Sequence, residues 1–118
     1  MMILVIDSNR VFGGCVMRTL KKIGFGVKLF DNAIDAMQPI SDGEVPEMIF
    51  MDVILKGPDG FTFLNELASY IDTFNIPVVI VSEKDFSKFK LLHYGVVGAL
   101  DKNTMRPEEV EDYAKKYT

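Results

Sequence analysis

The stretch MIFMD at residues 48–52 decides how this chain folds, because four apolar residues run without interruption into an aspartate. A short run that is apolar at every position is typical of a parallel strand buried on both faces of a sheet. Similar runs lie at Met2–Ile6 and Pro77–Val81, and two shorter candidate strands lie at Val27–Phe30, which includes Lys28, and at Gly98–Leu100. The sequence therefore predicts five strands in one sheet.

Segments with helical periodicity alternate with these strands, at Asn9–Ile23, Ala33–Ile40, Phe61–Tyr70, Phe86–Tyr94 and Pro107–Tyr117. Strands that alternate with helices indicate an α/β fold whose parallel sheet is covered by helices on both faces. The second helix is expected to break near Pro39, since proline lacks the backbone N–H that a helix interior needs.

Composition narrows the class of protein. The chain has 118 residues, a net charge of −4 and a single cysteine, Cys15. We expect one domain over residues 1–118. The first helix is expected to face the core with Val11, Cys15, Val16, Leu20 and Ile23, so Cys15 would be a small buried residue. The acidic balance argues against a nucleic-acid surface, and no apolar run is long enough for a membrane helix. The missing disulfide and the absence of a signal peptide favour the cytoplasm.

Polar residues follow the strands at the points where each strand ends. Asp7, Asp52 and Ser82 follow the first, third and fourth strands, and Asp101 and Lys102 follow the fifth. The carboxyl ends of parallel strands meet at one edge, where ligands bind in open α/β sheets. Carboxylates hold a hard cation, while an ammonium and a hydroxyl contact phosphoryl oxygens. These residue types together indicate a site for a divalent cation and a phosphoryl group.

Four stretches, taken in order, resemble the receiver domain of two-component response regulators. They are ILVIDSN at residues 3–9, DVILKGPDG at 52–60, VVIVS at 78–82 and GVVGALDK at 95–102, and 30 positions separate Asp52 from Ser82. The resemblance extends over essentially the whole chain. It implies a doubly wound, flavodoxin-like (βα)5 fold of the CheY type, with strand order 2-1-3-4-5.

The resemblance also implies a role for each site residue. Asp52 would accept a phosphoryl group from a histidine kinase or a phosphotransfer protein. Asp7, Asp52 and the backbone carbonyl of Ile54 would hold Mg²⁺. Lys102 would contact the phosphoryl group, and Ser82 would move toward it. Such a domain is a switch rather than a metabolic enzyme, because its only reactions are its own phosphorylation and dephosphorylation.

Four positions depart from the family's pattern. One is Asn103, which replaces the usual proline after the lysine, so no cis peptide bond is expected there. Ser8 stands where a second acid is usual, so it would contribute only weakly or through a water, and Mg²⁺ should bind less tightly. Glu83 stands where a small residue is usual. Ala99 replaces the aromatic residue that normally moves with the switch hydroxyl. Ile54 and Lys84 flank the site and are expected, with Glu83, to modulate the phosphoryl group's lifetime.

Two functions remain open on these residues. The first is a phosphorylation switch, whose downstream protein partner would bind the surface formed by residues 86–94, 98–100 and 107–117. The second is a pseudo-receiver, a protein-interaction module that works without phosphorylation. Each site residue also has a simpler interpretation: Asp7, Asp52 and Ser82 can cap the segments that follow them, and Lys102 can be a solvated lysine.

Overall fold

In the computed structural model, which describes residues 2–55, 60–83 and 95–118, five parallel strands form one sheet in the order β2-β1-β3-β4-β5. The elements in chain order are β1 (Met2–Ile6), α1 (Arg10–Lys22), β2 (Gly26–Phe30), α2 (Ala33–Ser41), β3 (Met48–Met51), α3 (Gly60–Ala68), β4 (Val78–Ser82), β5 (Val96–Asp101) and α4 (Pro107–Tyr117). The predicted fold class and strand order are confirmed. The helix predicted over residues 86–94 lies outside the described residues.

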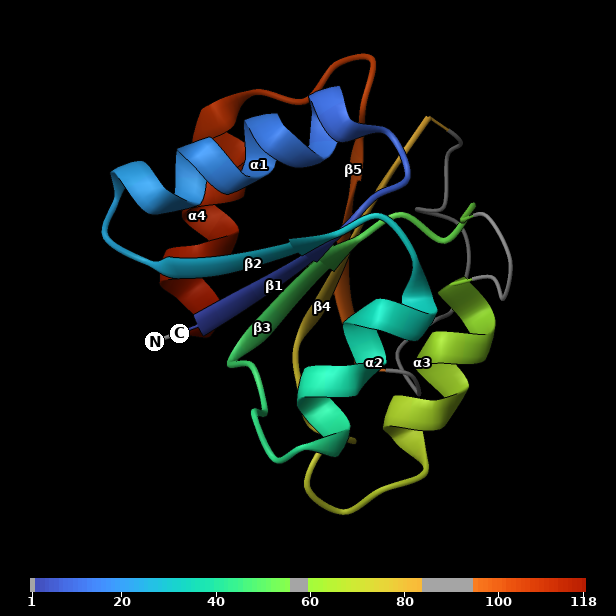
Figure 1. The fold of residues 1–118 in the computed structure, drawn as a ribbon. Helices are drawn as coiled ribbons and strands as arrows, with labels where there is room; N and C mark the ends of the chain where they lie inside the picture. Colours follow the sequence, from blue (N-terminus) through green and yellow to red (C-terminus); the bar gives the residue numbers. More distant parts are fainter. Residues whose placement is uncertain (1, 56–59, 84–94) are drawn as a thin grey trace.

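The sheet separates two hydrophobic cores. Helices α1 and α4 cover one face, and α2 and α3 cover the other (Figure 1). Successive strand residues point to opposite faces, so alternate residues of β1 feed different cores: Ile3 and Val5 pack under α1 and α4, whereas Leu4 and Ile6 pack under α2 and α3. Every residue of β3 is buried, as its uninterrupted apolar sequence predicts.

Helix α1 contacts the sheet through a face that differs from the predicted one. The side chain of Asn9 caps the helix by accepting hydrogen bonds from the backbone N–H groups of Val11 and Phe12. Gly13 is buried so closely that a Cβ atom there would lie 2.9 Å from Cδ1 of Leu29. The predicted inward positions of Val11 and Cys15 are wrong, since Val11 is 71% exposed and Cys15 is exposed. Because glycine brings the backbone itself to the sheet, the helix turns these two side chains outward.

Helix α2 continues through Pro39 to Ser41, so the break predicted there does not occur. Pro39 lies in the last turn of the helix, and its own carbonyl accepts a hydrogen bond from the N–H of Glu44. Asn32 caps the start of the helix, and its side chain accepts a hydrogen bond from the N–H of Asp35. None of the described helices is both long and apolar enough to span a bilayer.

Helix α3 begins with a glycine that the packing requires. Gly60 N–H donates a hydrogen bond to the carbonyl of Val53, and a Cβ atom on Gly60 would lie 2.4 Å from the Cα of Val53. The start of α3 therefore rests directly on the backbone that follows Asp52. This contact holds Val53, the residue after Asp52, against the start of α3.

Candidate functional site

The carboxyl ends of four adjacent strands bring the predicted residues to one edge of the sheet. Asp7 follows β1, Asp52 follows β3, Ser82 ends β4 and Lys102 follows β5. Backbone hydrogen bonds continue the ladder at this edge, from Asp52 N–H to the Ile6 carbonyl and from Lys102 N–H to the Ser82 carbonyl. All four residues are buried, with 2–7% of their surface exposed. The side chains of Asp7, Asp52 and Lys102 meet directly.

The ammonium group of Lys102 joins the two buried carboxylates. Its Nζ lies 2.8 Å from Oδ2 of Asp7 and 2.8 Å from Oδ2 of Asp52, and 3.0 Å from Oδ1 of Asp7. Only 3% of the lysine side chain is exposed. Lys102 is therefore an internal lysine and not a solvated surface residue. Residues that are 50 and 95 positions apart in the chain form one charged cluster.

Backbone N–H groups orient both carboxylates. Asn9 N–H donates to Oδ1 of Asp7 at 2.9 Å, and Ile54 N–H donates to Oδ1 of Asp52 at 3.0 Å. In each case the donor lies two residues after the acid. The backbone of the turn that follows the strand therefore holds the carboxylate at the end of that strand in place. The residue that caps α1 is Asn9 and not Asp7, and Oδ2 of each acid is directed at Lys102.

The cluster carries more negative than positive charge. Burial raises the pKa of the Asp7 carboxyl above its ordinary value, the hydrogen bonds from Lys102 and Asn9 oppose this, and the charge of Asp52 adds to the rise. For Lys102, burial lowers the pKa, but the hydrogen bonds and charges of Asp52 and Asp7 outweigh it, so its net pKa is raised. Two ionised carboxylates beside one ammonium group leave one negative charge in excess, which favours binding of a cation.

The donors fit a hard cation only in part. Asp7 and Asp52 supply oxygen ligands of the kind that Mg²⁺ prefers, and the Ile54 backbone lies beside Asp52. Over residues 2–55, 60–83 and 95–118, no group of three or more His, Cys, Asp or Glu side chains is arranged to hold a metal ion. Ser8, at the second acid position, is half-buried and adds no charge.

The remaining predicted residues surround this cluster. Glu83 is exposed just beyond β4, and the Ile54 side chain is 51% exposed. Ala99 is partly buried and packs against the core under α2 and α3. Lys84 lies outside the described residues. Asp101 is exposed, and its Oδ1 accepts a hydrogen bond from Asn103 N–H, so it belongs to the turn and not to the charged cluster.

Phe12 is a member of the site that sequence reasoning missed. Nζ of Lys102 lies 5.0 Å from the centroid of the Phe12 ring, within the range of a cation–π contact. A phenylalanine in the first turn of an amphipathic helix is expected to be a core residue. Only the approach of α1 to the end of β5 places its ring over an ammonium group.

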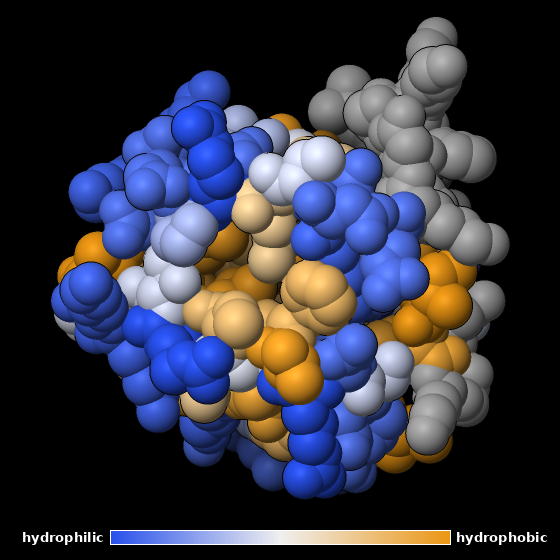
Figure 2. Space-filling view, turned by 90° about the horizontal axis from the view of Figure 1, so that it is seen from above, coloured by the Kyte–Doolittle hydropathy of each residue, from blue (hydrophilic) through white to orange (hydrophobic). Residues whose placement is uncertain are grey.

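Two surface hollows adjoin the cluster. One, of about 460 Å³, lies beside Asp7 and is lined also by Arg10, Asp31 and Asp35. The other, of about 230 Å³, lies between α1 and α4 and includes Phe12 and Lys102 in its lining. Figure 2, which shows the molecule from above, has apolar residues near the centre of the view and hydrophilic residues around them. The cluster itself is buried, but Asp7 lines the first hollow and Lys102 the second.

Comparison with known proteins agrees with this geometry. The response regulator receiver domain family matches residues 3–114 of the chain. The Protein PilH of Pseudomonas aeruginosa is 30% identical over 83 residues, which are 70% of this chain and 68% of PilH. Other curated relatives are longer, and the matching region spans 10–51% of their length.

Solved structures share the fold over nearly the whole chain. A response regulator from Chloroflexus aurantiacus superposes with a TM-score of 0.87 at 23% identity, covering 98% of this chain and 95% of the other. The receiver domain of the sensor histidine kinase PA1611 from Pseudomonas aeruginosa has a TM-score of 0.81 at 19% identity, covers 98% and 95%, and holds a magnesium ion in its active-site cleft. By its sequence and by the charged cluster at the edge of its sheet, this chain belongs to the family of response regulator receiver domains.

Proposed function

We propose that this receiver domain accepts a phosphoryl group on Asp52 and so switches the binding of a protein partner. The observation that carries the proposal is the cluster of Asp7, Asp52 and Lys102, in which a buried ammonium lies 2.8 Å from the carboxylate that would react. A buried acid pair with a single shared lysine is costly for stability. Such a cost is explained if the acids serve a reaction.

The reaction transfers a phosphoryl group from a phosphohistidine of a kinase or phosphotransfer protein. A carboxylate oxygen of Asp52 forms a bond to phosphorus while the bond from phosphorus to the histidine nitrogen breaks, and the electron pair of that bond stays on the imidazole. Oδ1 of Asp52 is held by Ile54 N–H and Oδ2 by Lys102. Lys102 would offset the charge that gathers on the phosphoryl oxygens. A donor of this class fits the family, since one structural relative is the receiver domain of a sensor histidine kinase.

Asp7 and Asp52, with the backbone carbonyl of Ile54 and Ser8 through a water, would hold Mg²⁺. The ion would neutralise the excess negative charge of the acid pair and of the incoming phosphoryl group. Because Ser8 brings no charge to the site, we expect its affinity for Mg²⁺ to be lower than that of a site with three acids.

Ser82 would carry the signal from the phosphoryl group. It is 2% exposed at the end of β4, and its backbone carbonyl is bonded to Lys102 N–H. Its partner strand β5 leads to α4, so movement at Ser82 can reach the described part of the proposed partner surface. The exposed side chains of Glu83 and Ile54 lie where they would modulate the lifetime of the phosphoryl group, as would Lys84 from its place in the sequence.

Phosphorylation by a small donor tests this function. With Mg²⁺ and acetyl phosphate or phosphoramidate, intact-protein mass spectrometry should show one added phosphoryl group. Asp52→Asn should abolish the adduct. Asp101→Asn is the matched control, because Asp101 lies on the same edge but its carboxylate is exposed and accepts a hydrogen bond from Asn103 N–H. This variant should react as the parent does. Absence of an adduct with either donor would eliminate a working phosphoacceptor.

A pseudo-receiver is the second candidate, favoured by the half-buried Ser8, the exposed Glu83 and the small Ala99. In this case the cluster would serve only as a scaffold, and partner binding would not depend on phosphorylation. Affinity for a partner, once captured, should then be the same for the parent chain and Asp52→Asn. A partner that discriminates between the phosphorylated and unphosphorylated chain would exclude this alternative.

A further inference from the structure

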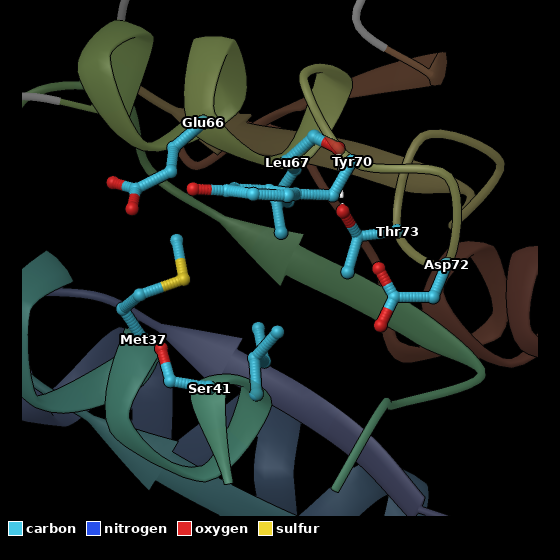
Figure 3. A pocket seen from close by; sticks show the side chains of 8 residues that line it. Met37, Ser41, Glu66, Leu67, Tyr70, Asp72 and Thr73 are labelled. Carbon is cyan, nitrogen blue, oxygen red and sulfur yellow. Dashed lines mark hydrogen bonds between the residues drawn. The ribbon is translucent and has the colours of Figure 1, made fainter. Parts of the chain in front are cut away.

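The groove between α2 and α3 lies on the face of the sheet opposite α1 and α4. It consists of two adjoining hollows of about 290 and 300 Å³, which share Met37, Ser41 and Glu66 in their linings. Figure 3 shows Met37 and Ser41 from α2 facing Glu66, Leu67 and Tyr70 across the first hollow, with Asp72 at the far end from Glu66. Nothing in the charged cluster of Asp7, Asp52 and Lys102 lines this groove.

The groove has an apolar floor, and its rim carries apolar as well as polar residues. Ile40 and Leu67 form the floor and are 7% and 2% exposed, while Met37 is partly buried beside them. Ile34 and Tyr70 stand at the rim and are 64% and 57% exposed. Large apolar side chains at such exposure, gathered around a concave surface, mark an interaction site more often than isolated ones do.

The charge of this face is of one sign. The segments Ala33–Glu47 and Gly60–Pro77 contain six acidic residues and no lysine or arginine. Of these acids, Glu66 and Asp72 line the groove itself, whereas Glu44 outside it is paired with Lys28 of β2. The described basic residues are otherwise on α1, on α4 and in the turn before α4. An occupant of this groove must therefore bring positive charge.

We propose that the α2–α3 groove binds a basic amphipathic helix of a partner protein. Two neighbouring helices leave a furrow into which a third helix can place apolar residues at i, i+4 and i+7. Helices α2 and α3 have nine residues each, and at 1.5 Å per residue the furrow is about 14 Å long, enough for between two and three helical turns. Lysine or arginine beside the apolar stripe pairs with Glu66 and Asp72.

The other occupants fit the groove less well. Two copies that paired symmetrically through this face would place acidic residues opposite acidic residues. An anionic lipid surface would meet the same repulsion and would not fill a concave furrow. The proposal does not depend on phosphorylation of Asp52, because the groove and the charged cluster share no residue.

A displayed library of short helical peptides, selected on the whole chain, tests the proposal. We expect the enriched peptides to be amphipathic and to carry an excess of lysine and arginine over acids. Binding of a purified enriched peptide, measured by calorimetry, should weaken by about tenfold or more in Glu66→Lys. Tyr70→Ala should also weaken it, which separates the apolar contribution from the charge contribution.

Asp112→Lys is the matched control, since Asp112 is also exposed on a helix and its replacement changes the net charge equally. This variant should leave the affinity within about twofold. Circular dichroism confirms that each variant is folded. The proposal is wrong if enriched peptides lack basic residues, if the two charge reversals act equally, or if no groove-dependent peptide is enriched. Self-association or binding to phosphatidylglycerol vesicles that Glu66→Lys abolishes would show another occupant and would also overturn it.

Discussion

At the scale of a single residue, burial in the charged cluster destabilises the ionised form of Asp7. Its carboxylate is buried beside a second acid, and burial raises its pKa above the ordinary 3.8. The folded chain therefore binds this proton more tightly than the unfolded chain does. As the pH rises above the ordinary pKa of Asp7, the free energy of unfolding therefore falls. The fall ends when Asp7 is ionised in both the folded and the unfolded chain.

Replacing Asp7 by Asn should remove this pH-dependent penalty. In metal-free buffer, the free energy of unfolding of Asp7→Asn minus that of the parent should increase between about pH 4 and pH 7. Urea unfolding followed by circular dichroism, with EDTA present, measures this difference. A difference that is flat or decreases over the range would contradict the raised pKa of Asp7.

At the scale of an element, the placement of α3 depends on the lack of a side chain at its first residue. A Cβ atom on Gly60 would lie 2.4 Å from the Cα of Val53, and backbone at that position has little freedom to move. Since Val53 follows Asp52 directly, α3 and the proposed phosphoacceptor loop are positioned together.

Gly60→Ala should therefore destabilise the chain by about 2 kcal/mol or more, because the helix must shift away from the strand end. Gly14→Ala is the control. A Cβ atom there would meet only Nη1 of Arg18, at 3.3 Å, and alanine stabilises a helix interior by up to about 1 kcal/mol over glycine. The same substitution should thus have opposite signs at the two positions in urea unfolding. Equal effects would show that Gly60 is not held by the contact with Val53.

At the scale of the whole molecule, the two cores share one sheet. Leu64 of α3 and Leu20 of α1 are each 0% exposed, in different cores. The strands belong to one sheet, and the sheet contributes side chains to both cores. Loss of either core should therefore unfold the whole chain and not only one half of it.

Leu64→Ala and Leu20→Ala should each lower the free energy of unfolding by about 2–5 kcal/mol. Each variant should still unfold in a single transition, with far-UV circular dichroism and tyrosine fluorescence giving the same midpoint. Tyr70 follows α3, whereas Tyr113 and Tyr117 lie on α4, so the fluorescence reports on both faces. Separate midpoints for the two probes would indicate that the faces unfold independently.

The sequence predicted the strands better than the surfaces of the helices. Short uninterrupted apolar runs are typical of parallel strands that are buried on both faces. The observed bounds of β1, β3 and β4 accordingly lie within one residue of the predicted bounds. Helical periodicity does not show how the helix is rotated on the sheet. Val11 and Cys15 were predicted inward and lie outward, because the buried Gly13 carries no apolar side chain for the periodicity to count.

By itself, then, the sequence determined the polar residues at the carboxyl ends of the strands, which follow from local hydrophobicity and spacing. The family, and with it the order of the strands, came from the four stretches that resemble receiver domains. Only the tertiary structure decided that Lys102 turns inward to both Asp7 and Asp52 and that Phe12 covers it. It also decided that α2 and α3 leave an acidic, apolar groove between them. Such contacts join residues that are distant in the chain, and their geometry is set by how the helices pack on the sheet.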